Sequence, residues 1–203
     1  KIGGKNLEKI IFNCRSITPM FISGVEDNDK EVRASSLKGL LRFWWRAINY
    51  KLPLEELRKQ ESIIFGGTDE NSGRSKIIII VDTKTNPTEK KISMTPHKNR
   101  GIQSAYIYNF DVTVKCEKDN EELIINLFKL LSLLGGIGKR SRRGFGSFEI
   151  YSINGVENTE SSSLENIYGI IENLVKGSYK INNNCIEISE KNTKNDYPYI
   201  EKI

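Results

Sequence analysis

The chain has 203 residues, with 31 Lys or Arg against 26 Asp or Glu, for a net charge of +5 at pH 7. Its three cysteines are odd in number and far apart, which excludes a disulfide framework and a paired-cysteine zinc site. An apolar run at residues 123–134 is too short to span a bilayer and contains Asn126 and Lys129. We therefore expect a cytoplasmic protein without a membrane span, and neither a metal nor a cofactor.

The spacing of apolar residues along the chain predicts a series of strands and helices. In chain order these are a strand at 10–17, a helix at 37–50, a short helix at 53–65, a strand at 76–81, a strand at 106–116 that could break near Asn109, a helix at 123–134 and a strand at 145–153. The short helix and a long connection at 82–103 interrupt a β-α-β-β-α-β series. The series predicts an α+β, ferredoxin-like (RRM-like) domain at 1–154.

A C-terminal helical extension follows, at residues 155–203. It begins with a polar linker at 155–163, and an amphipathic helix is expected from Leu164 to Val175. A further short strand is expected around Cys185 to Ile188. The extension is interpreted as the start or remnant of a second domain.

A glycine-rich basic loop at residues 135–147 lies between the apolar helix and the last strand. A dinucleotide fingerprint needs a strand before the loop, and a phosphate loop of the Walker type needs Ser or Thr where Arg140 stands. The loop has no acid beside its four cations, Lys139, Arg140, Arg142 and Arg143. Such a loop suits an extended polyanion better than one buried phosphate.

The remaining basic residues are separated from the acids along the chain. Residues 32–54 and 90–110 contain cations and no acid. In the expected topology, three connections share one end of the sheet, and their cations converge there. These cations are Arg33, Lys90, Lys91, Lys98 and Arg100, together with those of the glycine-rich loop. Composition alone fits a solvated surface equally well, but this convergence favours RNA or DNA binding.

The helix at 37–50 is expected to divide by face. Leu37, Leu40, Leu41, Trp44 and Ile48 form the expected core face, with Trp45 at its boundary. Lys38, Arg42, Arg46 and Asn49 form the opposite arc. Lys38 and Arg42 are the expected RNA contacts, whereas Arg46 could instead brace the sheet or a neighbouring subunit.

Two motifs together resemble one family. The helix motif LKGLLRFWWRA and the loop motif GGIGKRSRRGFGS, with ESIIFG between them, resemble the RAMP superfamily of CRISPR proteins over residues 10–153. Within it, the motifs look most like those of the first RAMP subunit of the type III-B (Cmr) effector complex. The resemblance implies a subunit of an RNA-guided antiviral complex that contacts crRNA, single-stranded target RNA or both, and other RAMP subunits. Members of the family usually carry two such domains.

Two functions from different classes follow. The first is a non-catalytic RNA-binding subunit that holds backbone phosphates through Lys38, Arg42, Lys98, Arg100 and the loop cations. Phe145 could stack a base there or plug the core beneath the loop. The alternative is a metal-independent endoribonuclease using His97, the only histidine. A metal nuclease would have to use Glu26, Asp27 and Asp29, which are more simply a solvated acidic loop.

Overall fold

The computed structural model describes residues 7–22, 31–67, 73–84, 86–95 and 100–189. Its centre is a five-stranded sheet in the order β2-β5-β1-β6-β7, in which all neighbouring strands are antiparallel. The strands are β1 (Glu8–Ser16), β2 (Ile77–Thr83), β5 (Asn109–Cys116), β6 (Phe148–Ile153) and β7 (Val156–Glu157). The fold is therefore α+β with an antiparallel sheet, as the sequence predicted.

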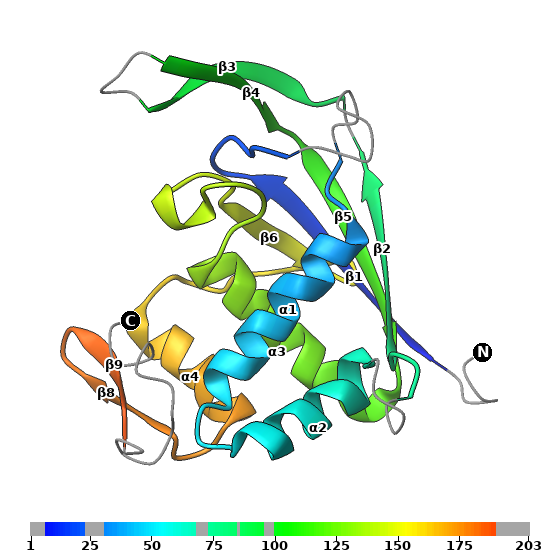
Figure 1. Cartoon of the computed structure of the whole chain (residues 1–203), viewed down its shortest axis with the longest axis vertical. Coiled ribbons are helices and arrows are strands. Elements are labelled where there is room, and N and C mark those ends of the chain that lie inside the picture. Colours follow the sequence, from blue (N-terminus) through cyan, green and yellow to red (C-terminus); the bar gives the residue numbers. More distant parts are fainter. Residues whose placement is uncertain (1–6, 23–30, 68–72, 85, 96–99, 190–203) are drawn as a thin grey trace.

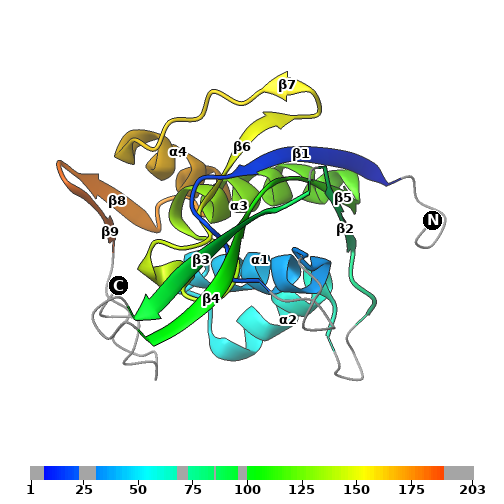
Figure 2. The ribbon, with the colours of Figure 1, turned by 90° about the horizontal axis from the view of Figure 1, so that it is seen from above.

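The helices lie on one side of this sheet (Figures 1 and 2). They are α1 (Ala34–Ile48), α2 (Leu54–Phe65), α3 (Glu121–Leu134) and α4 (Leu164–Leu174). Alternate residues of β1, namely Ile10, Phe12 and Cys14, are fully buried on the helix side. Phe12 stacks on Phe128 of α3 with ring centroids 4.2 Å apart, so the main core lies between the sheet and the helices.

The connection expected at residues 82–103 is instead a β-hairpin, which corrects the sequence prediction. It consists of β3 (Thr88–Thr95) and β4 (Arg100–Ile107), and it projects beyond the sheet (Figure 1). The strand expected at 106–116 is divided at Tyr108, where β4 ends and β5 begins. The hairpin gave no clear signal because its described side chains are mostly exposed on both faces, so apolar and polar residues do not alternate.

The side of α1 that packs into the core also differs from the expectation. Trp45, expected at the boundary, is only 3% exposed, whereas Trp44, expected in the core, is half-buried. Trp44 instead lies against the start of the glycine-rich loop, where a Cβ on Gly135 would come 3.0 Å from its Nε1. Consecutive tryptophans both fall within the apolar arc, and only packing against the neighbouring elements decides which one enters the core.

The C-terminal part packs against the rest of the molecule. Ile167, Ile170 and Ile171 of α4 belong to the same buried cluster as the sheet. The expected short strand is confirmed as β9 (Cys185–Ile188), and it pairs with β8 (Tyr179–Asn182). The Tyr179 hydroxyl donates to the Ala47 carbonyl at 3.0 Å, which joins this hairpin to the end of α1. Within the described residues, no helix has the length and hydrophobicity needed to cross a membrane.

Candidate nucleic-acid interface

Backbone hydrogen bonds hold the glycine-rich loop in a defined conformation. The Ile137 N–H donates to the Gly146 carbonyl at 2.9 Å and closes the loop at its base. The loop is also bonded to the segment that follows β1. The backbone N–H of Gly146 donates to the Pro19 carbonyl at 3.0 Å, and the backbone N–H of Lys139 donates to the Phe21 carbonyl at 2.9 Å. The loop is therefore a rigid platform, which lowers the conformational entropy that binding a ligand would cost.

Two glycines are required by this geometry. Gly138 has φ +94°, and a Cβ there would lie 2.5 Å from the Phe21 carbonyl oxygen. Gly146 has φ +72°, and a Cβ there would overlap the carbonyl oxygen of Ile137. Only glycine combines a positive φ with such close approach of another backbone. The glycine pattern therefore serves the fixed shape of the loop.

The loop presents its cations outward. A single 3-10 turn at Ser141–Arg143 follows Arg140, which has the left-handed conformation at φ 62°. Lys139, Arg142 and Arg143 are exposed, and none forms an ion pair with another described residue. Arg140 is half-buried and interacts within the chain. The loop thus exposes three cations that have no ion pair with another described residue, and such clustered positive charge attracts negatively charged groups.

Aromatic and aliphatic side chains anchor the underside of the loop. Ile137 is 1% exposed and belongs to the core cluster. Phe145 is half-buried and meets Phe21 edge to face, with ring centroids 4.9 Å apart. Of the two roles expected for Phe145, the structure therefore supports packing under the loop.

The segment after β1 also joins the loop to the β3–β4 hairpin. Met20 forms a β-bridge with Tyr106 of β4, and the adjacent Phe21 forms one with Lys139 of the loop. The hairpin and the loop thus lie at the same end of the sheet, as the topology predicted (Figure 1). In the hairpin, Lys90 is exposed, whereas the Lys91 ammonium pairs with Glu89 at 2.7 Å.

Several predicted residues fall where the structure gives no side-chain position. Lys98 and His97 lie outside the described residues, and so do Glu26, Asp27 and Asp29. Arg100 is described as the first residue of β4, but only in its backbone. Among the described residues, no group of three or more His, Cys, Asp or Glu could hold a metal ion.

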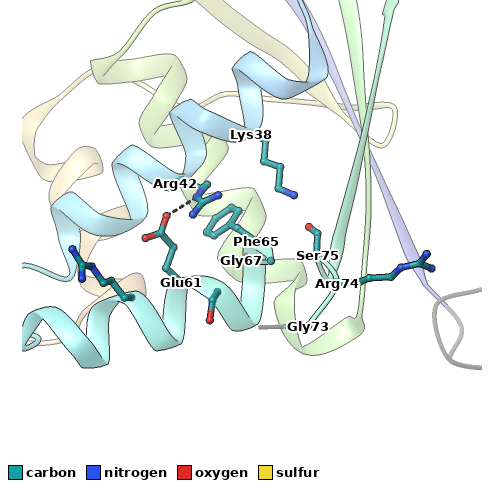
Figure 3. Close-up of a pocket in the computed structure, with 11 residues that line it drawn as sticks. Lys38, Arg42, Glu61, Phe65, Gly67, Gly73, Arg74 and Ser75 are labelled. Carbon is teal, nitrogen blue, oxygen red and sulfur yellow. Dashed lines mark hydrogen bonds and ion pairs between the residues drawn. The ribbon is translucent and has the colours of Figure 1, made fainter. Parts of the chain in front are cut away.

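Lys38 and Arg42 lie elsewhere, in a pocket of about 500 Å³ between α1, α2 and the start of β2 (Figure 3). No residue of the glycine-rich loop lines this pocket. Arg42 Nε donates to Glu61 Oε1 at 2.5 Å, and Arg46 Nη1 donates to the same oxygen at 3.3 Å. The Glu61 side chain is only 5% exposed. Arg42 is thus held by an internal ion pair, and Arg46 braces α2 rather than the sheet.

Sequence reasoning missed two parts of this arrangement. Glu61 is a charged residue in a helix with other acids, so nothing in the pattern marks it as buried. The segment from Thr18 to Ile22, which backs the loop, looks in sequence like no more than the end of a strand. Its partners are more than 80 residues away along the chain, and no local periodicity reports such contacts.

Two of the three cysteines are unsuited to act as nucleophiles. Cys14 and Cys116 are both fully buried. Burial raises the pKa of the Cys14 thiol far above its ordinary value, and burial is also the main cause that raises the pKa of Cys116 to about 11. Because only the thiolate is nucleophilic, neither residue supplies a nucleophile at neutral pH.

Comparisons with known proteins agree with the resemblance. The model of a family described as the RAMP superfamily matches residues 13–149. The chain is 26% identical over 175 residues to the CRISPR system Cmr subunit Cmr1-2 of Pyrococcus furiosus, covering 69% of this chain and 94% of that protein. It is 30% identical over 161 residues to Cmr subunit Cmr1-1 of the same organism, covering 68% of this chain and 46% of that protein. The chain therefore spans about half the length of Cmr1-1.

Two solved structures share the fold at lower identity. The crystal structure of Cmr1 from Pyrococcus furiosus, in its apo form, has a TM-score of 0.60 and 22% identity, over 82% of this chain and 60% of that chain. A chain in the cryo-EM structure of the type III-B Cmr-beta complex, bound to cognate target RNA and AMPPnP in the presence of ssDNA, has a TM-score of 0.56 and 14% identity. That match covers 94% of this chain and 66% of the other.

Proposed function

The chain belongs to the RAMP superfamily, and from this we propose that it is a non-catalytic RNA-binding subunit of an RNA-guided CRISPR effector complex of type III-B. Its partners would be crRNA, single-stranded target RNA or both, and other RAMP subunits. The names of the two curated relatives, both Cmr subunits, support this assignment.

We also assign the domain to the ferredoxin-like type. The strands β2-β5-β1-β6 are neighbours in that order, with α1 between β1 and β2 in sequence and α3 between β5 and β6. This arrangement supports a β-α-β-β-α-β domain in which the β3–β4 hairpin is an insertion between the second and third strands.

The observation that carries the proposal is the rigid loop with its three outward cations. Its hydrogen bonds to Pro19 and Phe21 fix the turn, while Lys139, Arg142 and Arg143 remain exposed. Charge displayed in this way binds phosphate oxygens along a strand and reads no base edges. We therefore expect affinity for single-stranded RNA with little sequence preference and a strong dependence on salt.

The residue types present in the loop argue against catalysis. Arginine stays protonated at any relevant pH, so it stabilises charge but is a poor general base. The exposed described residues of the loop include no histidine, carboxylate or cysteine. The runner-up function, an endoribonuclease using His97, is therefore tested directly below.

The binding experiment compares two triple variants in which the same amount of charge is removed. Lys139, Arg142 and Arg143 are replaced by Ala in the first variant. The control replaces Lys9, Lys118 and Lys176, which are exposed cations outside the loop. With fluorescent single-stranded RNA, the loop variant should bind at least tenfold more weakly and the control should bind almost normally. The slope of log K against log salt should fall by about 0.7 for each phosphate that the variant no longer neutralises.

Equal weakening in the two variants would show that only net charge matters and would overturn the loop as the site. The same purified proteins should be incubated with end-labelled RNA in EDTA, magnesium or manganese, and no cleavage is expected. Discrete products that disappear in His97→Ala would replace the binding-only function with a ribonuclease. Metal-dependent products that survive this substitution would implicate Glu26, Asp27 and Asp29.

A further inference from the structure

The strand β2 forms one edge of the central sheet (Figure 1). Among the described residues, no strand pairs with its outer side. Residues 77–81 are all aliphatic, without the lysine or proline that often protects an exposed edge. Ile78 and Ile80, on the face away from the helices, are 38% and 46% exposed. This edge of the sheet is therefore apolar as well as open.

The backbone groups on the outer side belong to the odd-numbered residues of β2. The Lys84 N–H donates to the Asn109 carbonyl of β5 at 3.1 Å, and successive residues of an antiparallel strand turn their backbone groups to opposite sides. The even-numbered residues of β2 therefore face β5, whereas Ile77, Ile79 and Val81 face outward. In the part of the chain that the structure describes, no hydrogen bond reaches the outward groups of Ile79 or Val81.

A side chain caps the first of these outward residues. The Ile77 N–H donates to Ser75 Oγ at 3.3 Å, and Ser75 Oγ donates to the Ile77 carbonyl at 2.8 Å. This local cap agrees with backbone groups of Ile77 that turn away from β5. The edge is thus covered at its start and open at Ile79 and Val81.

The sequence of β2 is complementary to itself in one antiparallel register, centred on Ile79. In this register, Ile78 of each copy lies opposite Ile80 of the other. Lys76 lies opposite Asp82. Sliding the strands by two residues, the smallest step that keeps their faces matched, instead places Ile80 opposite Lys76 or Ile78 opposite Asp82. Only the register centred on Ile79 pairs apolar with apolar residues and the cation with the acid.

The two charged residues of this register are accessible. The side chains of Lys76 and Asp82 are 39% and 66% exposed, although each has an ion pair within the chain. Lys76 Nζ lies 3.9 Å from Glu117 Oε2, and Asp82 Oδ2 lies 2.8 Å from Lys84 Nζ. Both charges can therefore reach across to a neighbouring strand at the edge.

We propose that two copies of this chain associate through antiparallel pairing of their β2 strands, in the register centred on Ile79. The two sheets then form one continuous sheet, in which the outward N–H and C=O groups of Ile79 bond to those of its counterpart. Ile77 exchanges its bonds to Ser75 for bonds to Val81 of the second copy. Because the same edge is used on both sides, the assembly closes at two copies. The glycine-rich loop precedes β6, which β5 and β1 separate from β2, so the loop stays accessible.

Sedimentation velocity on the full chain measures this association, and a discrete dimer that increases with concentration is expected. Ile80→Lys should raise the dimer dissociation constant at least tenfold, because it places a charge among apolar cross-strand pairs. Val156→Lys is the matched control, since Val156 is 71% exposed on β7, at the opposite edge of the sheet. It should leave the dimer unchanged. Circular dichroism would establish that each variant is folded.

Cross-linking tests the register. Ile78→Cys and Ile80→Cys are made separately, each with the exposed Cys185 replaced by Ser. The even-numbered residues form non-hydrogen-bonded pairs, whose Cα atoms lie about 4.5 Å apart, within the range of a disulfide. Mild oxidation of a mixture of the two variants should therefore join residue 78 of one copy to residue 80 of the other. Either variant alone should cross-link far less, because identical residues lie diagonally across the pair.

A monomer at every concentration, open-ended aggregates in place of a dimer, or equal effects of Ile80→Lys and Val156→Lys would overturn the proposal. Cross-linking of one variant alone as efficient as that of the mixture would reject the register centred on Ile79. The RNA-binding proposal fails or stands separately. The triple variant of Lys139, Arg142 and Arg143 should remain dimeric, and Ile80→Lys should retain its affinity for single-stranded RNA.

Discussion

The tight closure of the glycine-rich loop predicts that two of its glycines respond very differently to alanine. Gly144 and Gly146 both have positive φ, at +81° and +72°. A Cβ on Gly144 would meet no other atom within 4 Å, whereas one on Gly146 would overlap the Ile137 carbonyl oxygen and lie 3.0 Å from its carbonyl carbon. The pair therefore separates the cost of backbone conformation from the cost of steric overlap.

The expected magnitudes follow from these contacts. Gly144→Ala should lower the free energy of unfolding by about 1 kcal/mol, the cost of a left-handed conformation for a residue with a Cβ. Gly146→Ala carries the same conformational cost. In addition, the overlap of the new Cβ with the Ile137 carbonyl oxygen breaks two hydrogen bonds. These run from Ile137 N to the Gly146 carbonyl and from Gly146 N to the Pro19 carbonyl. At about 1 kcal/mol for each bond, the free energy of unfolding should fall by about 3 kcal/mol in total.

Urea unfolding at 25 °C, followed by tryptophan fluorescence, measures both changes from the midpoint at constant slope. RNA binding provides a second readout. Gly146→Ala should weaken it because Lys139, Arg142 and Arg143 no longer have a fixed arrangement, while Gly144→Ala should retain most of it. If Gly146→Ala were no more destabilising than Gly144→Ala, the description of the loop as a closed, backbone-bonded turn would be wrong.

Two further predictions concern α1. Trp45→Ala should destabilise the protein by about 3–5 kcal/mol as a truncation in the core, and the half-buried Trp44→Ala by clearly less; the reverse order in urea unfolding would contradict the observed helix face. Glu61→Gln should cost about 1–3 kcal/mol, because it removes from a buried position the carboxylate that pairs with Arg42 and Arg46. An unchanged unfolding midpoint in Glu61→Gln would refute the ion-pair network.

The order of the main elements was predictable because local patterns report it. The alternating apolar residues of β1 and the long apolar stretch of α3 show which side of each element is buried. The β3–β4 hairpin was not predicted because most of its described side chains are exposed; of these side chains only Ala105 and Tyr106, near the end of β4, are buried. The choice between Trp44 and Trp45 also escaped prediction, since both fit the apolar arc and only the surrounding elements distinguish them.

The candidate site, too, was predictable from sequence only in part. The glycines and arginines of residues 135–147 identified the loop from sequence, because positive φ and clustered charge are properties of the residues themselves. Which cations remain available was decided only by contacts between distant segments. Arg42 resembles Arg142 in sequence terms, yet Glu61 engages Arg42, while Arg142 has no ion pair among the described residues.

The sequence by itself thus determined the types and the order of the main elements, without the β3–β4 hairpin, and the position of the basic loop, because these depend on short-range periodicity and on the chemistry of individual residues. Tertiary structure alone decided that the loop is rigid, since its bonds to Pro19 and Phe21 join residues more than 110 positions apart. It also placed Lys38 and Arg42 in a pocket of their own, because the packing of α1 against α2 sets which cations face each other.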